Sequence, residues 1–197
     1  TIQSAGDITI STNGITPLIV DGTCIDLGVH FTVVPTGGTA PVIASSGYYY
    51  RYGGELTGNV LFAATAGPFS GGVFHMDGVR HTLWPSETEI TQPSLVTGMR
   101  DFQITNLHLD KPLGNTPLFT FNINTLAIDY KFVIDGVYGN DRYSAFGLVN
   151  IINAFGKVSP DITETISIKN INLKSYGMEN GRPLVTRDGL PYDVSSD

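Results

Sequence analysis

Six short segments of this chain repeat one pattern, in which two apolar residues alternate with variable residues and are followed by a glycine or an asparagine. Glycine and asparagine tolerate the left-handed backbone region that other residues avoid. A strand that bends sharply at one point therefore needs one of them at the bend. The six segments are Leu18–Thr23, Tyr50–Glu55, Phe74–Val79, Phe102–Leu107, Phe132–Val137 and Ile166–Ile171.

The repeats recur at spacings from 24 residues (Tyr50 to Phe74) to 34 residues (Phe132 to Ile166). Such a period is typical of architectures in which successive units stack and share one core. The alternation of apolar and variable residues predicts strands. We expect the first positions to stack as one column, and the bends as another, formed by Gly22, Gly54, Gly78, Asn106, Gly136 and Asn170.

Composition favours an all-β protein with one domain. The chain has 197 residues, 23 glycines, 11 prolines and 15% charged residues, which indicates many turns and few helices. A second apolar stretch follows each later repeat and predicts an opposite wall of the stack. These stretches are Leu118–Ile123, Phe146–Ile152 and Leu184–Thr186. We divide the domain 1–197 into an irregular N-terminal part (1–47), coil repeats (48–175) and a C-terminal loop or tail (176–197).

Charge and cysteine content exclude several classes of partner. The formal net charge is −7 and no basic stripe is present, so we expect no nucleic acid as a partner. No apolar segment reaches the length that crosses a membrane, and we expect no membrane partner. Cys24 is the only cysteine, so an intramolecular disulfide cannot form.

The sequence offers no convincing catalytic, cofactor or metal site. No Gly-x-Ser-x-Gly motif is present, and His75, Asp77 and His81 do not complete a metal-ligand set. Asp77 and Asp135 precede a turn glycine, where an aspartate side chain usually bonds to nearby backbone amides. We therefore predict no catalytic residue, no cofactor and no bound metal.

Aromatic and charged residues nevertheless suggest a contact surface. Tyr49 and Trp84 have large amphipathic rings that could stack on a sugar or dock a partner. Asp135, Asp141 and Arg142 could supply polar contacts along the same outer surface. These five residues are our candidates for partner or glycan contact.

The segments Phe102–Leu109 and Ile166–Leu173 resemble coils of the right-handed parallel β-helix (pectin-lyase-like) superfamily, in which an asparagine often stacks at the same bend. The resemblance covers residues 73–175 and, less closely, 18–60. It implies a short right-handed parallel β-helix; a β-sandwich or jelly roll is the alternative fold. The superfamily includes pectin-degrading enzymes, phage tailspikes and other virion-surface proteins. The enzymes' Asn-Thr-Asp, Asp-Asp and Gly-His-Gly motifs are absent here, and Arg182-Pro183 does not match the pectate-lyase element.

The resemblance and the missing motifs together indicate a role without catalysis. Open strand edges at the ends of a coil invite pairing, so we expect a homo-oligomer, with a trimer favoured. We expect a structural protein of a phage or virus particle, such as a capsid decoration or tail-associated protein, that contacts other virion proteins. The alternative is a carbohydrate-binding or carbohydrate-cleaving β-helix that is secreted or displayed on a cell surface.

Overall fold

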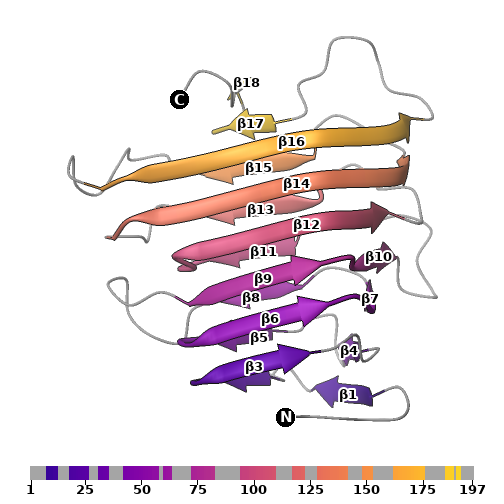
Figure 1. Cartoon of the computed structure of the whole chain (residues 1–197), viewed down its shortest axis with the longest axis vertical. Helices are drawn as coiled ribbons and strands as arrows, with labels where there is room; N and C mark the ends of the chain where they lie inside the picture. The colour runs from indigo at the N-terminus through magenta and orange to yellow at the C-terminus, as the bar shows by residue number, and fades with distance from the viewer. Residues whose placement is uncertain are drawn as a thin grey trace.

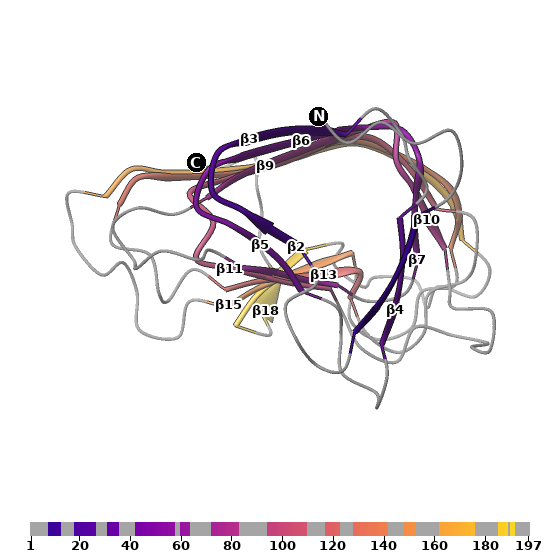
Figure 2. The same cartoon turned by 90° about the horizontal axis from the view of Figure 1, so that it is seen from below.

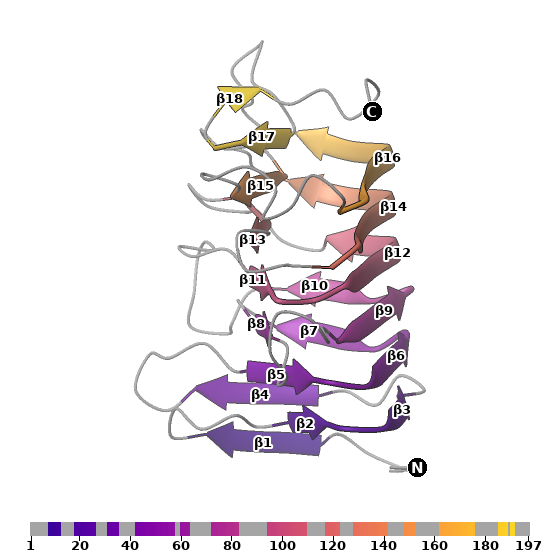
Figure 3. The same cartoon turned by 90° about the vertical axis from the view of Figure 1, so that its left-hand side faces the viewer.

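The protein is all-β in the part of the chain that its computed structural model describes, and no helix occurs there. The structure describes residues 8–12, 18–26, 31–35, 42–57, 60–63, 72–82, 94–109, 117–122, 128–141, 148–152, 162–175, 185–188 and 190–191. Two eight-stranded sheets dominate, and a separate pair of strands lies at the N-terminal end. The strands stack in chain order from β1 at one end to β17 and β18 at the other (Figures 1 and 3).

We call the first large sheet the bent sheet. It consists of β3 (Thr23–Asp26), β6 (Tyr48–Tyr52), β7 (Glu55–Thr57), β9 (Val73–Asp77), β10 (Arg80–Thr82), β12 (Asp101–Leu109), β14 (Tyr130–Asp141) and β16 (Glu164–Ser175). The facing sheet consists of β2 (Leu18–Val20), β5 (Val42–Ser45), β8 (Leu61–Ala63), β11 (Ser94–Thr97), β13 (Phe119–Asn122), β15 (Val149–Ile152), β17 (Val185–Arg187) and β18 (Leu190–Pro191). The small pair is β1 (Ile8–Thr12) and β4 (Phe31–Pro35).

The chain alternates between the two large sheets, so spatial neighbours come from successive turns of the chain. β2, β5, β8, β11, β13 and β15 each precede a strand of the bent sheet. Every described strand pair is parallel except β17 with β18. Seen from below, β4, β7 and β10 lie on a third side of the stack (Figure 2). Sandwiches and jelly rolls are built from antiparallel sheets, so this pairing argues against the alternative fold.

The register of the later turns follows the repeat. Phe74, Phe102, Phe132 and Ile166 lie opposite one another, as predicted. All four are buried, and the rings of Phe74, Phe102 and Phe132 stack with successive centroids 5.5 Å apart. From the facing sheet, Phe121 reaches within 4.1 Å of the Phe132 ring centroid. Stacked aromatic rings of this kind contribute a large share of core burial.

The predicted register of the second repeat is wrong by one residue. Tyr49, rather than Tyr50, lies opposite Phe74, and Arg51 lies opposite Met76. A shift of one residue in a strand exchanges its two faces. Tyr49 is therefore 1% exposed, whereas Tyr50 points outward.

The first repeat belongs to a different wall than predicted. Leu18–Val20 forms β2 of the facing sheet and pairs with β5, which lies in the part that we predicted as irregular. The bent sheet begins with β3 instead. Gly22 therefore lies at the corner between the sheets, where the Tyr48 N–H donates to its carbonyl. A Cβ on Gly47, the residue stacked above, would meet the Gly22 oxygen at 2.0 Å.

The bends of the other repeats form one column. Gly78, Asn106, Gly136 and Asn170 have φ of 68°, 53°, 83° and 56°, in the left-handed region. Gly53 (φ 75°) is the corresponding bend of the second turn, because the residue before it, Tyr52, lies opposite Asp77. The predicted bend residue was Gly54, which also has a positive φ. Past the bend, β7, β10 and the second halves of β12, β14 and β16 continue the bent sheet.

Strands β1 to β5 precede residue 48, and β3 and β5 pair directly with later strands. The stacked arrangement thus begins within the part that we predicted as irregular. At the other end, β17 and β18 lie within residues 176–197, and β17 extends the facing sheet. The predicted opposite wall at Leu118–Ile123, Phe146–Ile152 and Leu184–Thr186 contains β13, β15 and part of β17.

Candidate ligand-binding groove

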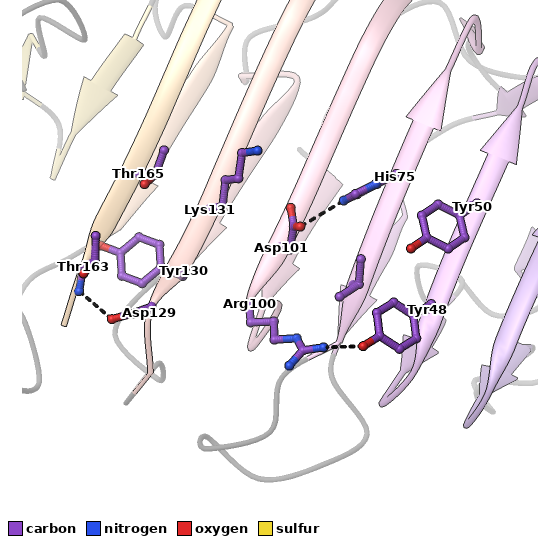
Figure 4. Close-up of a pocket in the computed structure, with 11 residues that line it drawn as sticks. Tyr48, Tyr50, His75, Arg100, Asp101, Asp129, Tyr130, Lys131, Thr163 and Thr165 are labelled. Carbon is purple, nitrogen blue, oxygen red and sulfur yellow. Dashed lines mark hydrogen bonds and ion pairs between the residues drawn. The ribbon is translucent and has the colours of Figure 1, made fainter.

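A shallow groove of about 380 Å³ runs across the outer face of the bent sheet, perpendicular to its strands (Figure 4). Residues of β6, β9, β12, β14 and β16, and residues just before three of these strands, line it. Because side chains alternate along a strand, most of the strand residues at the groove are outward residues. The exception is Tyr130 of β14, which is on the same side of its strand as Phe132 and is 5% exposed. The lining residues are Tyr48, Tyr50, Val73, His75, Arg100, Asp101, Asp129, Tyr130, Lys131, Thr163 and Thr165.

Two outward tyrosines of β6 form one end of the groove. The rings of Tyr48 and Tyr50 are 8° from parallel, and their centroids are 6.4 Å apart. The Arg100 guanidinium lies 5.7 Å from the Tyr48 ring centroid, and its Nη2 donates to the Tyr48 hydroxyl at 3.2 Å. Since Tyr48 is 42% exposed, its ring remains available to a ligand.

A histidine and an aspartate lie in the middle of the groove. His75 Nε2 is 3.1 Å from Asp101 Oδ2, which is an ion-pair distance when the imidazole is protonated. This nitrogen is buried but has no partner with hydrogen-bond geometry. Burial alone would raise the pKa of Asp101; contact with His75, a hydrogen bond from Gln103 and the Lys131 charge together hold that pKa below its ordinary value. Asp101 is therefore an anion at neutral pH.

The other end of the groove carries an exposed cation and hydroxyl groups. Lys131 is exposed, and its ammonium group has no hydrogen bond or ion pair within the described ranges. Asp129 already accepts the backbone N–H of Thr163 at 2.7 Å. Thr165 is exposed beside Lys131, its register partner in β14. Lys131 is thus the principal group at this end that could meet an anionic ligand.

The column of bends explains where Asp135 lies. Asn106 Nδ2 donates to Asp77 of the preceding turn at 2.8 Å, and Asn170 Nδ2 donates to Asp135 at 2.6 Å. Lys169 Nζ lies 3.2 Å from the second Asp135 oxygen. The Asn170 hydrogen bond and the Lys169 ammonium hold the pKa of Asp135 below its ordinary value. Asp135 therefore links two turns of the chain and does not line the groove.

The structure separates the other predicted contact residues. Tyr49 is buried, so its assignment as a contact residue is corrected: the register shift turns it into the core. Asp141 is the last residue of β14, and only its backbone is described. Trp84 and Arg142 lie outside the described residues. The groove instead uses Tyr48 and Tyr50, the neighbours of Tyr49 in β6, which were not among the predicted contact residues.

A charged cluster lies inside the N-terminal end of the stack, and the sequence pattern missed it. Arg51 and Asp26 are 1% and 4% exposed, and Arg51 Nε lies 3.9 Å from Asp26 Oδ2. The Tyr49 hydroxyl donates to the same oxygen at 3.0 Å. Burial raises the pKa of Tyr49 far above its ordinary value, against the effect of the Arg51 charge. This cluster could have been identified only by knowing which side chains of β3 and β6 point into the core, and the sequence leaves that ambiguous.

Comparison with family models, curated proteins and solved structures gave no significant match. No three His, Cys, Asp or Glu side chains gather into a metal-binding group in the described segments. A search of those same segments found no helix of the length and apolarity needed to cross a membrane. Cys24 is half-buried, and burial raises the pKa of its thiol.

Proposed function

We propose that this protein is a non-enzymatic structural component of a virus particle, built on a short right-handed parallel β-helix. It would act as a capsid decoration or tail-associated protein, through contacts with copies of itself and with other virion proteins. Two mostly parallel sheets with one strand of each per turn, and bends at stacked Gly and Asn residues, support the β-helix interpretation. The step from this architecture to a virion is an analogy of fold.

The observation that carries the proposal is the pairing of the outermost strands. Within the described part of the chain, the 12-residue strand β16 pairs with β14 on one side and with no strand on the other. At the opposite end, β3 pairs only with β6 among the described strands. Such edges favour further strand pairing. Among the described strands, the facing sheet alone ends in an antiparallel strand, β18, which is two residues long.

Exposed apolar side chains on the outside of the stack also favour assembly. Ile25, Tyr52 and Tyr138 are 49%, 50% and 44% exposed. Cyclic packing of copies side by side would cover part of this surface, and we propose a homotrimer as the closed form. We expect sedimentation equilibrium to give three times the 21.2 kDa chain mass. Tyr138→Glu should lower the association constant while the far-ultraviolet circular dichroism spectrum stays unchanged.

Electron microscopy of particles tests the virion assignment. Purified protein is added to particles of candidate phages that lack it, and bound protein is counted after sedimentation. A regular density at fixed sites on the head or tail would support the proposal. A chain that stays monomeric at all concentrations and binds no head or tail would refute it.

The groove supports a second candidate function, the binding of a carbohydrate. The groove offers a flat apolar surface at its two near-parallel tyrosines and polar contacts at its ion pair and hydroxyl groups. A sugar has the same combination of apolar and polar surface. Screening on an array of glycans tests this function. Tyr48→Ala should abolish the signal, whereas Tyr52→Ala, on the same strand but outside the groove, should not. Absence of signal for every glycan would exclude it.

A further inference from the structure

We infer that the open edge of β16 binds one extended strand of a different protein, which adds to the bent sheet as its next parallel strand. This inference rests on the proposed function, which the same edge carries, and it names the kind of partner that the edge fits. The partner strand would have the pattern apolar–x–apolar–acidic–Gly–apolar.

The two large sheets do not end at the same turn of the stack. β13 and β15 precede β14 and β16, so each such pair of strands makes one turn. The facing sheet continues past β15 with β17, which lies above β16 (Figure 1). The chain then reverses, because Arg187 lies opposite Leu190 of β18 in an antiparallel pair and Asp188 has φ of 49°. In the described part of the chain, no strand of the bent sheet follows β17, so this end of the bent sheet is one strand short.

An ion pair fixes β17 relative to the open edge. Arg187 Nη1 and Nη2 donate to the two carboxylate oxygens of Glu164, the first residue of β16, at 2.7 and 3.0 Å. Both side chains are largely buried, at 22% and 8% exposed. A bidentate pair of this kind holds its partners in one geometry. A partner strand would therefore meet a preorganised edge, and preorganisation lowers the entropic cost of binding.

The core is incompletely covered at this edge. Ile134 and Val137 of β14 are 0% exposed, whereas Ile168 and Ile171, their register partners on β16, are only partly buried. An edge strand also presents a row of unpaired backbone N–H and C=O groups. A further strand with apolar residues opposite these two isoleucines would cover them as β16 covers β14, and its backbone would pair with the edge.

The column of bends specifies two residues of the partner strand. A Cβ on Gly136 would lie 3.3 Å from Oδ1 of Asn106, the bend one turn below, so a glycine fits closely above an asparagine. Asn170 is the bend of β16, and we expect a glycine above it as well. The adjacent column ends at Lys169, which is 58% exposed and lies opposite Asp135. An acidic residue before the partner's glycine would pair with Lys169 from the other side.

A second copy of this chain does not fit the edge. Among the described strands of the long path through the bent sheet, β3 is the other end strand, and β2 lies beside it across the corner at Gly22 (Figure 3). A copy that placed β3 against β16 would bring its β2 to the level of β17, where the two would clash. It would also place Asp26, which is already paired with Arg51, in the column of Ile168. The strand must therefore come from another protein.

A labelled peptide with the sequence of residues 73–82 tests the inference, because it contains the pattern with Asp77 and Gly78. Whole protein is titrated into the peptide, and fluorescence anisotropy measures binding. We expect saturable binding, with slower hydrogen exchange in the β16 amides. The Asp77→Lys peptide should bind about fivefold more weakly, as loss of one cross-strand charge pair implies. The Gly78→Val peptide should also bind more weakly, because valine disfavours a positive φ.

A charge exchange locates the peptide on β16. Lys169→Glu in the protein should weaken binding of the unchanged peptide about fivefold and restore binding of the Asp77→Lys peptide. The control is Lys131→Glu, which makes the same charge change at an exposed residue of β14, away from the open edge. It should alter neither affinity. Circular dichroism checks that both variants fold.

Three results would overturn the inference. The first is no binding of the unchanged peptide to the wild-type protein. The second is slower exchange in β3 and not in β16, which would place the peptide at the opposite end. The third is equal weakening of both peptides by Lys169→Glu, which would remove the charge pair that defines the partner. Sedimentation and electron microscopy of particles decide separately on the proposed function.

Discussion

The buried pair Asp26–Arg51 makes the strongest prediction about stability. Both side chains lie in the inward column of the bent sheet that continues as Met76, Ile104 and Ile134. Replacing Asp26 with Ala leaves the Arg51 guanidinium 1% exposed without its carboxylate. Breaking a buried ion pair from one side costs about 3–5 kcal/mol. This is a large fraction of the roughly 5–15 kcal/mol that stabilises a domain.

Two bonds of Arg51 persist in that variant, because Nε and Nη2 donate to the carbonyls of Gly53 and Glu55 at 3.2 and 2.8 Å. The charge therefore cannot leave the core without breaking the bend. By contrast, the double variant Asp26→Leu/Arg51→Met extends the apolar column of Met76. Replacing a buried pair with apolar residues is often neutral or stabilising by about 1–4 kcal/mol. The remaining cost includes the two carbonyls that lose their donor and the buried Tyr49 hydroxyl that loses its acceptor, at about 1 kcal/mol each.

Urea denaturation followed by circular dichroism measures both effects. We expect the midpoint of Asp26→Ala to fall well below that of the wild type, and the double variant to lie much closer to it. The m-values should agree, since a difference would indicate a change in the two-state transition. A loss below about 1 kcal/mol for Asp26→Ala would mean that the pair behaves as a surface ion pair. That result would refute the buried register of β3 and β6.

Four further changes test the stack. Gly47→Ala should prevent the corner from forming, because the added Cβ would lie 2.0 Å from the Gly22 oxygen, and the soluble yield should fall sharply. Asn106→Ala should cost about 1–2 kcal/mol in urea denaturation, because alanine disfavours φ of 53°, whereas Asn106→Gly should cost less. Phe102→Ala should cost about 3–5 kcal/mol by the same measurement, because it empties the centre of the ring stack. The pKa of Asp101 is lower in the folded state than its ordinary value of 3.8, so the ionised carboxylate stabilises the folded state above that pH. This stabilisation is lost as the pH falls through the folded pKa. The stability difference between wild type and Asp101→Asn, measured by thermal denaturation, should therefore shrink below about pH 4.

The later turns could be predicted from sequence because each turn carries the same information. Phe102 and Phe132 occupy the same place before an asparagine or a glycine, and the structure pairs them directly. The second turn offered five residues of the sequence Tyr-Tyr-Tyr-Arg-Tyr, in which both faces look alike. The apolar pattern favoured Tyr50 as the inward residue because it would leave Arg51 outside. The carboxylate of Asp26 stabilises the opposite register, in which Tyr49 and Arg51 point into the core.

The groove could not be predicted, because no local motif encodes it. Tyr48, Asp101 and Lys131 come from three turns of the chain and meet only after the register is fixed. Their outward positions follow from period 2 once one inward residue is known in each strand. The one-residue error at Tyr49 was therefore enough to hide the aromatic end of the groove.

Each turn of the chain pairs with the turn before it and the turn after it and with no other described turn. The length of the protein along the stack therefore depends on the number of turns. Removing the residues from Phe102 to Lys131, one complete repeat between register partners, should shorten it by about 4.8 Å and leave both ends able to join. A tensile load along the axis would release such turns one after another from an end, so the molecule would yield gradually and not in a single event.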